Sequence, residues 1–87
     1  MRIWRLRTLA QRGVDAEADI VDVVPTRKAT DGQPWVTLHL RVHQTGQAPA
    51  DVRLTWLTRP FDMSRLVKGQ RIGVKILPGR PHVVALR

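Results

Sequence analysis

Apolar and polar residues alternate without interruption through the middle of the chain, in the stretch PWVTLHLRVH from Pro34 to His43. The even positions of this stretch are apolar: Val36, Leu38, Leu40 and Val42. The odd positions carry an aromatic ring, a hydroxyl, two imidazoles and a guanidinium: Trp35, Thr37, His39, Arg41 and His43. A period of two is that of a half-buried β-strand. We therefore predict a strand with one face in a sheet core and the other available for binding.

The stretch from Val14 to Val24 also alternates, but its phase changes at Ile20 and Val21. One extra residue inside a strand is typical of a β-bulge, so we predict a long, bent first strand in which Val21 and Val23 take over the inner face. We expect Pro25 to end this strand because proline cannot donate to a strand ladder. Residues 26–34 are then predicted to form a basic loop with a turn at Asp31-Gly32.

Three further strands are predicted, at residues 51–58, 71–77 and 82–87, with the PGRP stretch at 78–81 as a rigid turn before the last. Between the first two of these, residues 60–69 break the alternation and indicate a helix of one or two turns. Asp62 is its predicted N-cap, Phe61 and Leu66 a hydrophobic staple, and Gly69 its C′ residue.

Five strands with a bend in the first and a short helix between strands 3 and 4 predict an all-β fold. We expect a small five-stranded barrel, OB-like or SH3-like, formed by a single domain over residues 14–87. Residues 1–13, MRIWRLRTLAQRG, are predicted to be a basic N-terminal arm or short helix. This segment either packs over one end of the domain or lies on an anionic membrane surface.

The 87 residues include no cysteine, so 43% hydrophobic residues must supply the stability of the core without disulfides. No apolar run reaches the ~20 residues of a membrane-spanning helix. Arginines at positions 2, 5 and 7 interrupt what would be the apolar part of a signal peptide. We therefore expect a soluble cytoplasmic protein without a transmembrane segment.

Positive charge predominates and is unevenly distributed. The formal net charge is +8, from twelve Arg and three Lys against seven acidic residues. Residues 1–14 contribute +4, residues 15–22 contribute −4 and residues 23–87 contribute +8. This excess favours polyanions as partners, although a bias towards Arg can also reflect genomic base composition.

Several turns and strands together resemble an uncharacterised family of small bacterial all-β domains, over most of residues 5–86. The matching motifs are the Asp-Gly-Gln-Pro turn at 31–34, the step Lys-Gly-Gln-Arg-Ile-Gly-Val at 68–74, and the ending Leu-Pro-Gly-Arg-Pro-His-Val-Val-Ala-Leu at 77–86. Leu77 stands where the family prefers Asp. The resemblance implies a non-catalytic β domain, often an accessory to membrane-associated or larger proteins.

The residues argue against catalysis, metal binding and cofactors. Ser64 is the only serine and lies in no nucleophile motif, so we expect no enzyme activity and no catalytic residues. His39 and His43 share a strand face but are ~13 Å apart by strand geometry, too far to ligate one ion. No phosphate-binding loop is present. Asp15, Glu17 and Asp19 have the ~6–7 Å spacing of a carboxylate pair, but we expect them to pair with arginines of a neighbouring strand.

Binding of nucleic acid is the function that agrees with most of these features. OB-folds bind single strands on the face of strands 2 and 3, where aromatic side chains stack on bases and cations follow the backbone. The candidate residues are Arg27, Lys28, Trp35, His39, Arg41, His43, Arg53 and Arg59. Trp56 is in phase with the core, and Trp4 is expected to cover one end of the barrel. The alternative is a protein-interaction or membrane-proximal accessory domain, in which Trp35, Leu57 and Leu77 form an apolar patch or an edge strand pairs with a partner or a second copy.

Overall fold

The computed structural model of the chain describes residues 13–77 and 80–87, which form one antiparallel sheet of five strands. The strands are β1 (Val14–Thr30), β2 (Gln33–His43), β3 (Ala50–Leu57), β4 (Arg71–Leu77) and β5 (Arg80–Leu86). A 3₁₀ helix, η1 (Pro60–Ser64), lies between β3 and β4. The predicted all-β fold is therefore confirmed. The predicted arm of residues 1–13, apart from Gly13, and Pro78-Gly79 of the PGRP turn lie outside the described residues.

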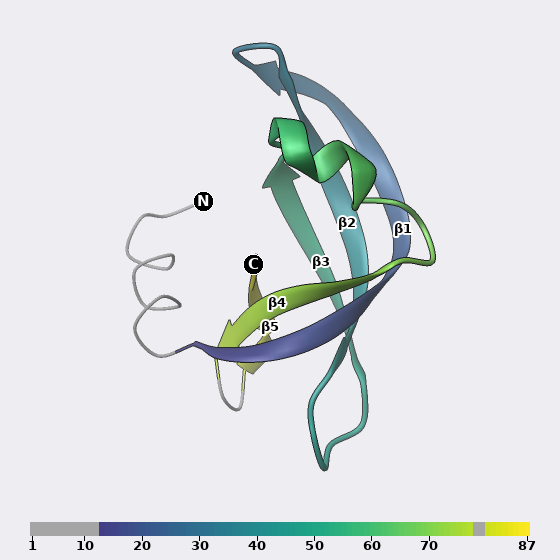
Figure 1. Cartoon of the computed structure of the whole chain (residues 1–87), viewed down its shortest axis with the longest axis vertical. Coiled ribbons are helices and arrows are strands. Elements are labelled where there is room, and N and C mark those ends of the chain that lie inside the picture. Colours follow the sequence, from purple (N-terminus) through teal and green to yellow (C-terminus); the bar gives the residue numbers. More distant parts are fainter. Residues whose placement is uncertain (1–12, 78–79) are drawn as a thin grey trace.

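The strand order is β3-β2-β1-β4-β5. Three consecutive strands form a meander, and the fourth returns beside the first, which is a Greek key. β1 is long and strongly curved: residues 14–19 pair with β4, and residues 17–30 pair with β2 (Figure 1). The sheet is thereby curled into a half-barrel, and β3 at one edge approaches β5 at the other.

The core fills the concave side of the curled sheet. The inner face predicted for β2 is confirmed, since Val36, Leu38, Leu40 and Val42 are all buried. The other buried apolar residues come from all four remaining strands: Ala18, Ile20, Val52, Trp56, Ile72, Val74, Ile76, Val84 and Leu86. Trp56 lies in the core as predicted.

The predicted bulge in β1 is present, but one of the two valines that were predicted to face inward points outward. Ile20 is opposite Leu40 and Asp22 is opposite His39, which leaves Val21 as the extra residue. Val21 is 41% exposed, so the prediction that it joins the inner face is wrong, whereas Val23 packs against the core. The bulge lies where β1 separates from β4, because the ladder between these strands ends at Asp19 and Arg71. It therefore marks the corner of the half-barrel.

β1 does not end at Pro25, and residues 26–34 are not a loop as predicted. Instead β1 continues to Thr30 and forms a hairpin with β2. Proline is tolerated here because this part of β1 has β2 on one side only, and the register shifts directly after Pro25. Only the turn is correctly predicted: Asp31 and Gly32 both have positive φ, 50° and 77°. Two such residues are typical of a type I′ hairpin.

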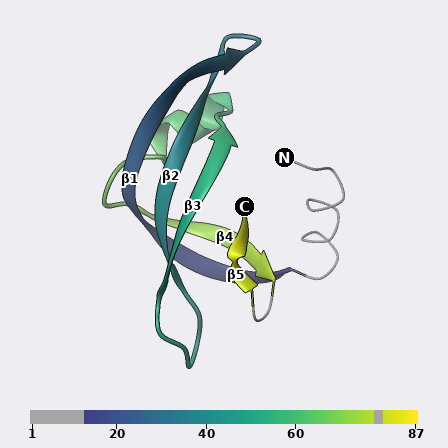
Figure 2. The same cartoon turned by 180° about the vertical axis from the view of Figure 1, so that it is seen from behind.

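A short helix follows β3 as predicted, but it is a 3₁₀ helix that ends at Ser64, before the predicted C′ residue Gly69, and its capping is different. Arg59 is the N-cap, Pro60 follows at the first helical position, and Asp62 is the third residue of η1 rather than its cap. The Asp62 side chain turns back to accept the backbone N–H of Arg59 at 2.9 Å. Phe61, the predicted staple, is 59% exposed. η1 lies across the upper half of β2 and β3 on the concave side, in front of them in Figure 1 and behind them in Figure 2.

Candidate nucleic-acid interface

The outer face of β2 and β3 carries four of the eight candidate residues in register. Trp35 is opposite Leu57, His39 is opposite Arg53, and Arg41 is opposite Asp51. Directly opposite side chains in an antiparallel pair are near neighbours, with Cβ atoms ~4.5–5.5 Å apart. The strand pairing therefore gathers Trp35, His39, Arg41 and Arg53 on one surface, as predicted. Leu77 lies at the end of β4 beside the start of β1, so it does not join Trp35 and Leu57 in one apolar patch.

Trp35 lies in an open groove at the hairpin end of this face. Thr26, Lys28, Trp35 and Thr55 line the groove. The Trp35 indole is partly exposed, and its Nε1–H donates to the Thr30 hydroxyl at 2.9 Å. This hydrogen bond fixes the ring against the hairpin. Trp35 thus combines an accessible aromatic surface with a neighbouring ammonium group.

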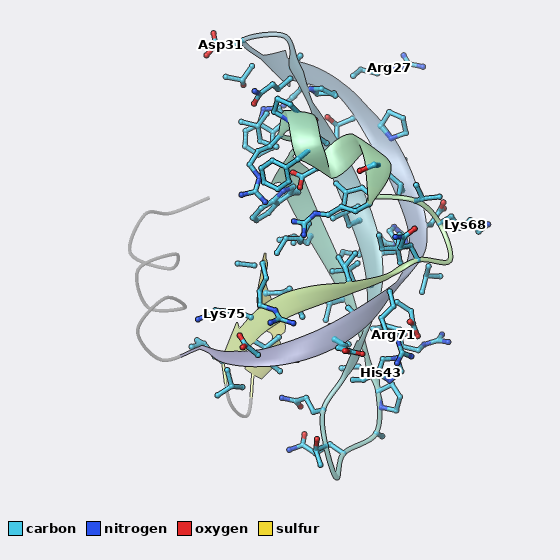
Figure 3. All side chains as sticks on the ribbon, in the orientation of Figure 1. Arg27, Asp31, His43, Lys68, Arg71 and Lys75 are labelled. Carbon is cyan, nitrogen blue, oxygen red and sulfur yellow. The ribbon has the colours of Figure 1, made fainter. Side chains whose placement is uncertain are left out.

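A second bulge in β1, at residues 26–28, brings Arg27 and Lys28 to the same end of the sheet. Residues 26–28 of β1 stand opposite Trp35 alone, because the ladder shifts between Pro25 and Ala29. The Thr26 hydroxyl holds the bulge together: it donates to the Trp35 carbonyl at 2.9 Å and accepts the Lys28 N–H at 3.3 Å. Arg27 has a left-handed backbone, with φ of 69°. Its side chain projects away from the hairpin into solvent (Figure 3).

A second groove on the same face contains three further candidates. It is lined by Val21, His39, Leu40, Arg41, Asp51, Val52 and Arg53. Arg41 Nε lies 3.2 Å from Asp51 Oδ1, and both side chains are exposed. An exposed pair of this kind is worth ~0–1 kcal/mol, so it is readily exchanged for another anion. Arg53 forms no ion pair with any of the described residues.

His43 is drawn into a different network at the other end of β2. Its Nε2 lies 2.8 Å from Asp19 Oδ2, and Arg71 Nε of β4 donates to Asp19 Oδ1 at 2.8 Å. Figure 3 shows His43 and Arg71 on the same side of the sheet. The hydrogen bond from Arg71 and then that from His43 lower the pKa of Asp19 to about 2. His43 is therefore bound to an acidic residue of β1 and does not extend the cationic surface.

Glu17 and Asp15 of β1 also pair with arginines. Arg71 lies on the neighbouring strand β4, as predicted, whereas Arg87 follows β5, which does not neighbour β1. Glu17 pairs with Arg71 at 3.4 Å, and Asp15 pairs with Arg87 at 3.4 Å. The Arg87 guanidinium crosses the position that a Cβ of residue 73 would occupy, so glycine here gives this flexible side chain room to reach Asp15. These pairs leave Arg27, Lys28 and Arg53 as cations outside the ion pairs of the described residues at the β2–β3 face.

Arg59 belongs to a separate cluster around η1. Its guanidinium lies over the rings of Trp56 and Phe61, at 5.5 and 4.4 Å from their centroids. It also pairs with the buried carboxylate of Asp62, Nε to Oδ2 at 3.2 Å. Arg65 Nε donates to the other oxygen of this carboxylate at 3.0 Å. Arg59 is thus not brought to the outer face of β2 and β3.

Burial raises the pKa of Asp62, but the hydrogen bonds that its carboxylate accepts lower this pKa by more. The carboxylate is completely buried and accepts hydrogen bonds from the Arg59 backbone, from Arg59 and Arg65, and from Trp56 Nε1 at 3.3 Å. Together these donors lower the pKa of Asp62 below its usual value. The side chain therefore stays ionised and links β3, η1 and the turn after η1.

Sequence reasoning missed Thr26, Thr55 and the exposed ring of Phe61. Thr26 and Thr55 line the Trp35 groove, but threonine in a strand gives no distinguishing signal. Phe61 could have been identified from its two flanking arginines at positions 59 and 65, because guanidinium groups commonly stack on aromatic rings.

Within residues 13–77 and 80–87, no group of three His, Asp or Glu side chains is arranged to hold a metal ion. Ser64 Oγ donates to the Phe61 carbonyl at 3.4 Å and contacts no general base there. The helical part of the described chain is too short to cross a membrane.

Comparison with known proteins found no match for this chain: no family model, no curated protein and no solved structure is similar to it.

Proposed function

We propose that this protein is a non-enzymatic, cytoplasmic module that binds single-stranded nucleic acid on the outer face of β2 and β3. One observation carries the proposal: Trp35 shares a groove with Lys28, and Arg53, which is outside the ion pairs of the described residues, lines a second groove on the same face. A stacked base is worth ~1–3 kcal/mol on such an aromatic ring. The neighbouring cations would hold the phosphates on either side of that base.

The strand order supports an OB-like interpretation of the barrel. The OB-fold is a partly open five-stranded Greek-key barrel that binds oligonucleotides on strands 2 and 3 and on the loop between strands 1 and 2. Here β4 lies beside β1 rather than continuing the meander from β3. The bulge with Arg27 and Lys28 lies in the hairpin that joins β1 to β2. In an OB-like module, Arg27 and Lys28 would therefore lie in a loop that contacts the oligonucleotide.

Salt dependence of oligonucleotide binding tests the proposal. Each phosphate contact with a single strand contributes a slope of about −0.7 in a plot of log Kobs against log salt concentration. Three contacts, by Arg27, Lys28 and Arg53, predict a slope of roughly −2. Fluorescence anisotropy of a labelled oligonucleotide, measured over a series of salt concentrations, gives the slope directly.

Two matched variants test whether the outer face of β2 and β3 is the binding surface. Arg53→Gln should reduce the magnitude of the slope by about 0.7. Lys75→Gln is the control, because Lys75 lies on β4, opposite Asp15 of β1 and away from the β2–β3 face (Figure 3). An absence of salt-sensitive binding at micromolar concentrations of the unmodified protein, or equal effects of the two variants, contradicts the proposal.

A protein interface on the same face is the second candidate. Leu57 lies directly opposite Trp35, and Val24 of β1, opposite Thr37, is 41% exposed, so both add apolar surface beside Trp35. An apolar interface of this kind predicts a partner or a self-dimer whose affinity changes little with salt. Leu57→Asp and Trp35→Ala should both abolish that contact, as measured by sedimentation. A monomer that is indifferent to both changes excludes the self-dimer.

A further inference from the structure

Phe61, in η1, exposes its aromatic ring at the surface of the molecule. Its 59% exposure is the highest among the large exposed hydrophobic residues of the described chain. More than half of the accessible surface of this side chain therefore remains open to a ligand. Exposed aromatic rings of this kind are the stacking elements of proteins that bind single strands.

Two guanidinium groups hold the ring in place. The Cζ atoms of Arg59 and Arg65 lie 4.4 and 5.5 Å from the ring centroid. Both side chains are fixed by the same buried carboxylate, that of Asp62. The single negative charge of Asp62 offsets only one of these two positive charges. The cluster of Arg59, Phe61, Asp62 and Arg65 is therefore a fixed aromatic surface with a net positive charge.

The cluster follows β3 directly, at the end of the sheet that carries Trp35. Leu57, the last residue of β3, is opposite Trp35. The next residue, Thr58, is fastened to β2 by two hydrogen bonds to the Pro34 carbonyl, from its N–H at 3.0 Å and from its hydroxyl at 2.8 Å. Four positions separate Leu57 from Phe61. The two rings thus flank one end of β2 and β3, with Trp35 on the outer face and Phe61 on η1.

We infer that Phe61 is a second base-stacking site, reached by a single strand that leaves the Trp35 groove around the end of β3. This inference rests on the proposed function. The exposed face of the ring would stack on a base, and Arg59 and Arg65 would attract the adjoining phosphates. A short oligonucleotide would occupy the Trp35 groove alone, and a longer one would occupy both sites.

A structural role for Phe61 makes a different prediction. If the ring only shields the Asp62 carboxylate from water, leucine would serve nearly as well, because it covers a similar area without a π-face. Phe61→Leu therefore separates the two roles. Phe61→Trp keeps a stacking surface and adds a fluorophore to the site.

The test compares oligonucleotides of about four and about twelve nucleotides, which span the site sizes of single OB-folds. For the longer one, Phe61→Leu should weaken binding about 5- to 150-fold, the loss expected for one stacked base. Its affinity for the shorter one should be unchanged. Phe61→Trp should retain the affinity for the longer oligonucleotide, and its added fluorescence should respond to that oligonucleotide only. Val67→Ala is the control, because Val67 is also exposed in the connection between β3 and β4.

Three results would separate this inference from the proposed function. If the unmodified protein and Phe61→Leu bind the longer oligonucleotide equally, the second site is wrong while the Trp35 face stands. The second site is also wrong if Phe61→Leu weakens both lengths equally and lowers the thermal midpoint, since that pattern indicates a structural role. If the unmodified protein binds neither length, the proposed function fails and this inference fails with it.

Discussion

Asp62 shows how much a single side chain decides in this small fold. Its carboxylate is completely buried, yet three residues from three successive segments donate to it: Trp56 of β3, Arg59 before η1 and Arg65 after it. A buried charge is tolerated only when its hydrogen bonds replace those of water. Here the donors outweigh burial, so the pKa of Asp62 is lowered rather than raised.

Replacing Asp62 by Asn should strongly destabilise the protein. The amide keeps one acceptor oxygen, but it removes the charge that both arginines require and adds a buried donor. Removing one partner from a buried ion pair costs ~3–5 kcal/mol, and we expect a loss in this range. Urea denaturation followed by tryptophan fluorescence measures it. Asp51→Asn, in an exposed pair with Arg41, is the control and should change stability by less than about 1 kcal/mol.

Asp19 predicts a specific acid sensitivity. Its pKa of about 2 in the folded chain lies below the unfolded value of ~3.9, so its ionised form favours folding. This contribution is fully present above pH 4 and is lost as the pH falls from 4 to 2. The stability of Asp19→Asn should therefore fall less steeply over this range, as measured by thermal midpoints at each pH.

Arg71→Gln tests the cause of this sensitivity. Because the Arg71 hydrogen bond is the largest contribution to the lowered pKa, its loss should move the acid-induced decrease towards pH 4. An unchanged pH profile in Arg71→Gln would show that Asp19 depends on His43 instead.

At the scale of the elements, strict alternation made the strands predictable. The inner faces of β2 and β4 and the bulge near Ile20 follow from the order of apolar residues alone. The end of β1 could not be predicted in this way, because tolerance of Pro25 depends on which side of β1 lacks a partner. The orientation of Val21 was missed for a related reason. A change of phase shows that a residue is extra without showing where it points.

The bulge at residues 26–28 holds Arg27 in a strained backbone conformation. Substitutions at this residue can therefore change stability and binding independently. A non-glycine residue in a left-handed conformation costs ~1–2 kcal/mol, and glycine avoids this cost. Arg27→Gly and Arg27→Ala both remove the guanidinium, but only glycine relieves the φ of 69°. We expect both variants to lose the same amount of oligonucleotide affinity, while Arg27→Gly is more stable by about 1 kcal/mol. Denaturation and anisotropy of the two proteins, side by side, check this. Equal stabilities would show that the bulge relaxes in solution.

At the scale of the whole molecule, the sheet is curled but its edge strands are paired on one side only. β1, β2 and β4 have a hydrogen-bonded neighbour on both sides along part of their length, whereas β3 and β5 do not. Amide hydrogen exchange should therefore be slowest for Ile20 and Leu40, which pair directly at the corner of the sheet. Outward amides of β3 and β5 should exchange sooner. Uniform protection of all five strands would indicate that the barrel closes fully in solution.

The candidate site was only partly predictable from the sequence. The register brings Trp35, His39, Arg41 and Arg53 together because a single strand pair carries them. His43 and Arg59 do not join this surface, because Asp19 and Asp62 bind them instead. Asp19 is distant from His43 in the sequence, so that contact depends on the fold. Asp62 follows Arg59 by three residues and reaches it through the turn of η1. The sequence predicted that Asp15, Glu17 and Asp19 would pair with arginines. It could not show which cations would remain free afterwards.

The extra residue at the corner of β1 has a consequence for how this fold can change in evolution. Val21 occupies one codon between Ile20, which faces inward, and Asp22, which is opposite the outward His39. Loss of that codon would leave the inward and outward order of all remaining residues intact while removing the corner. Two descendants of this gene with nearly identical sequences would then differ in the curvature of the sheet. For this fold, an alignment gap at position 21 is more informative than most substitutions.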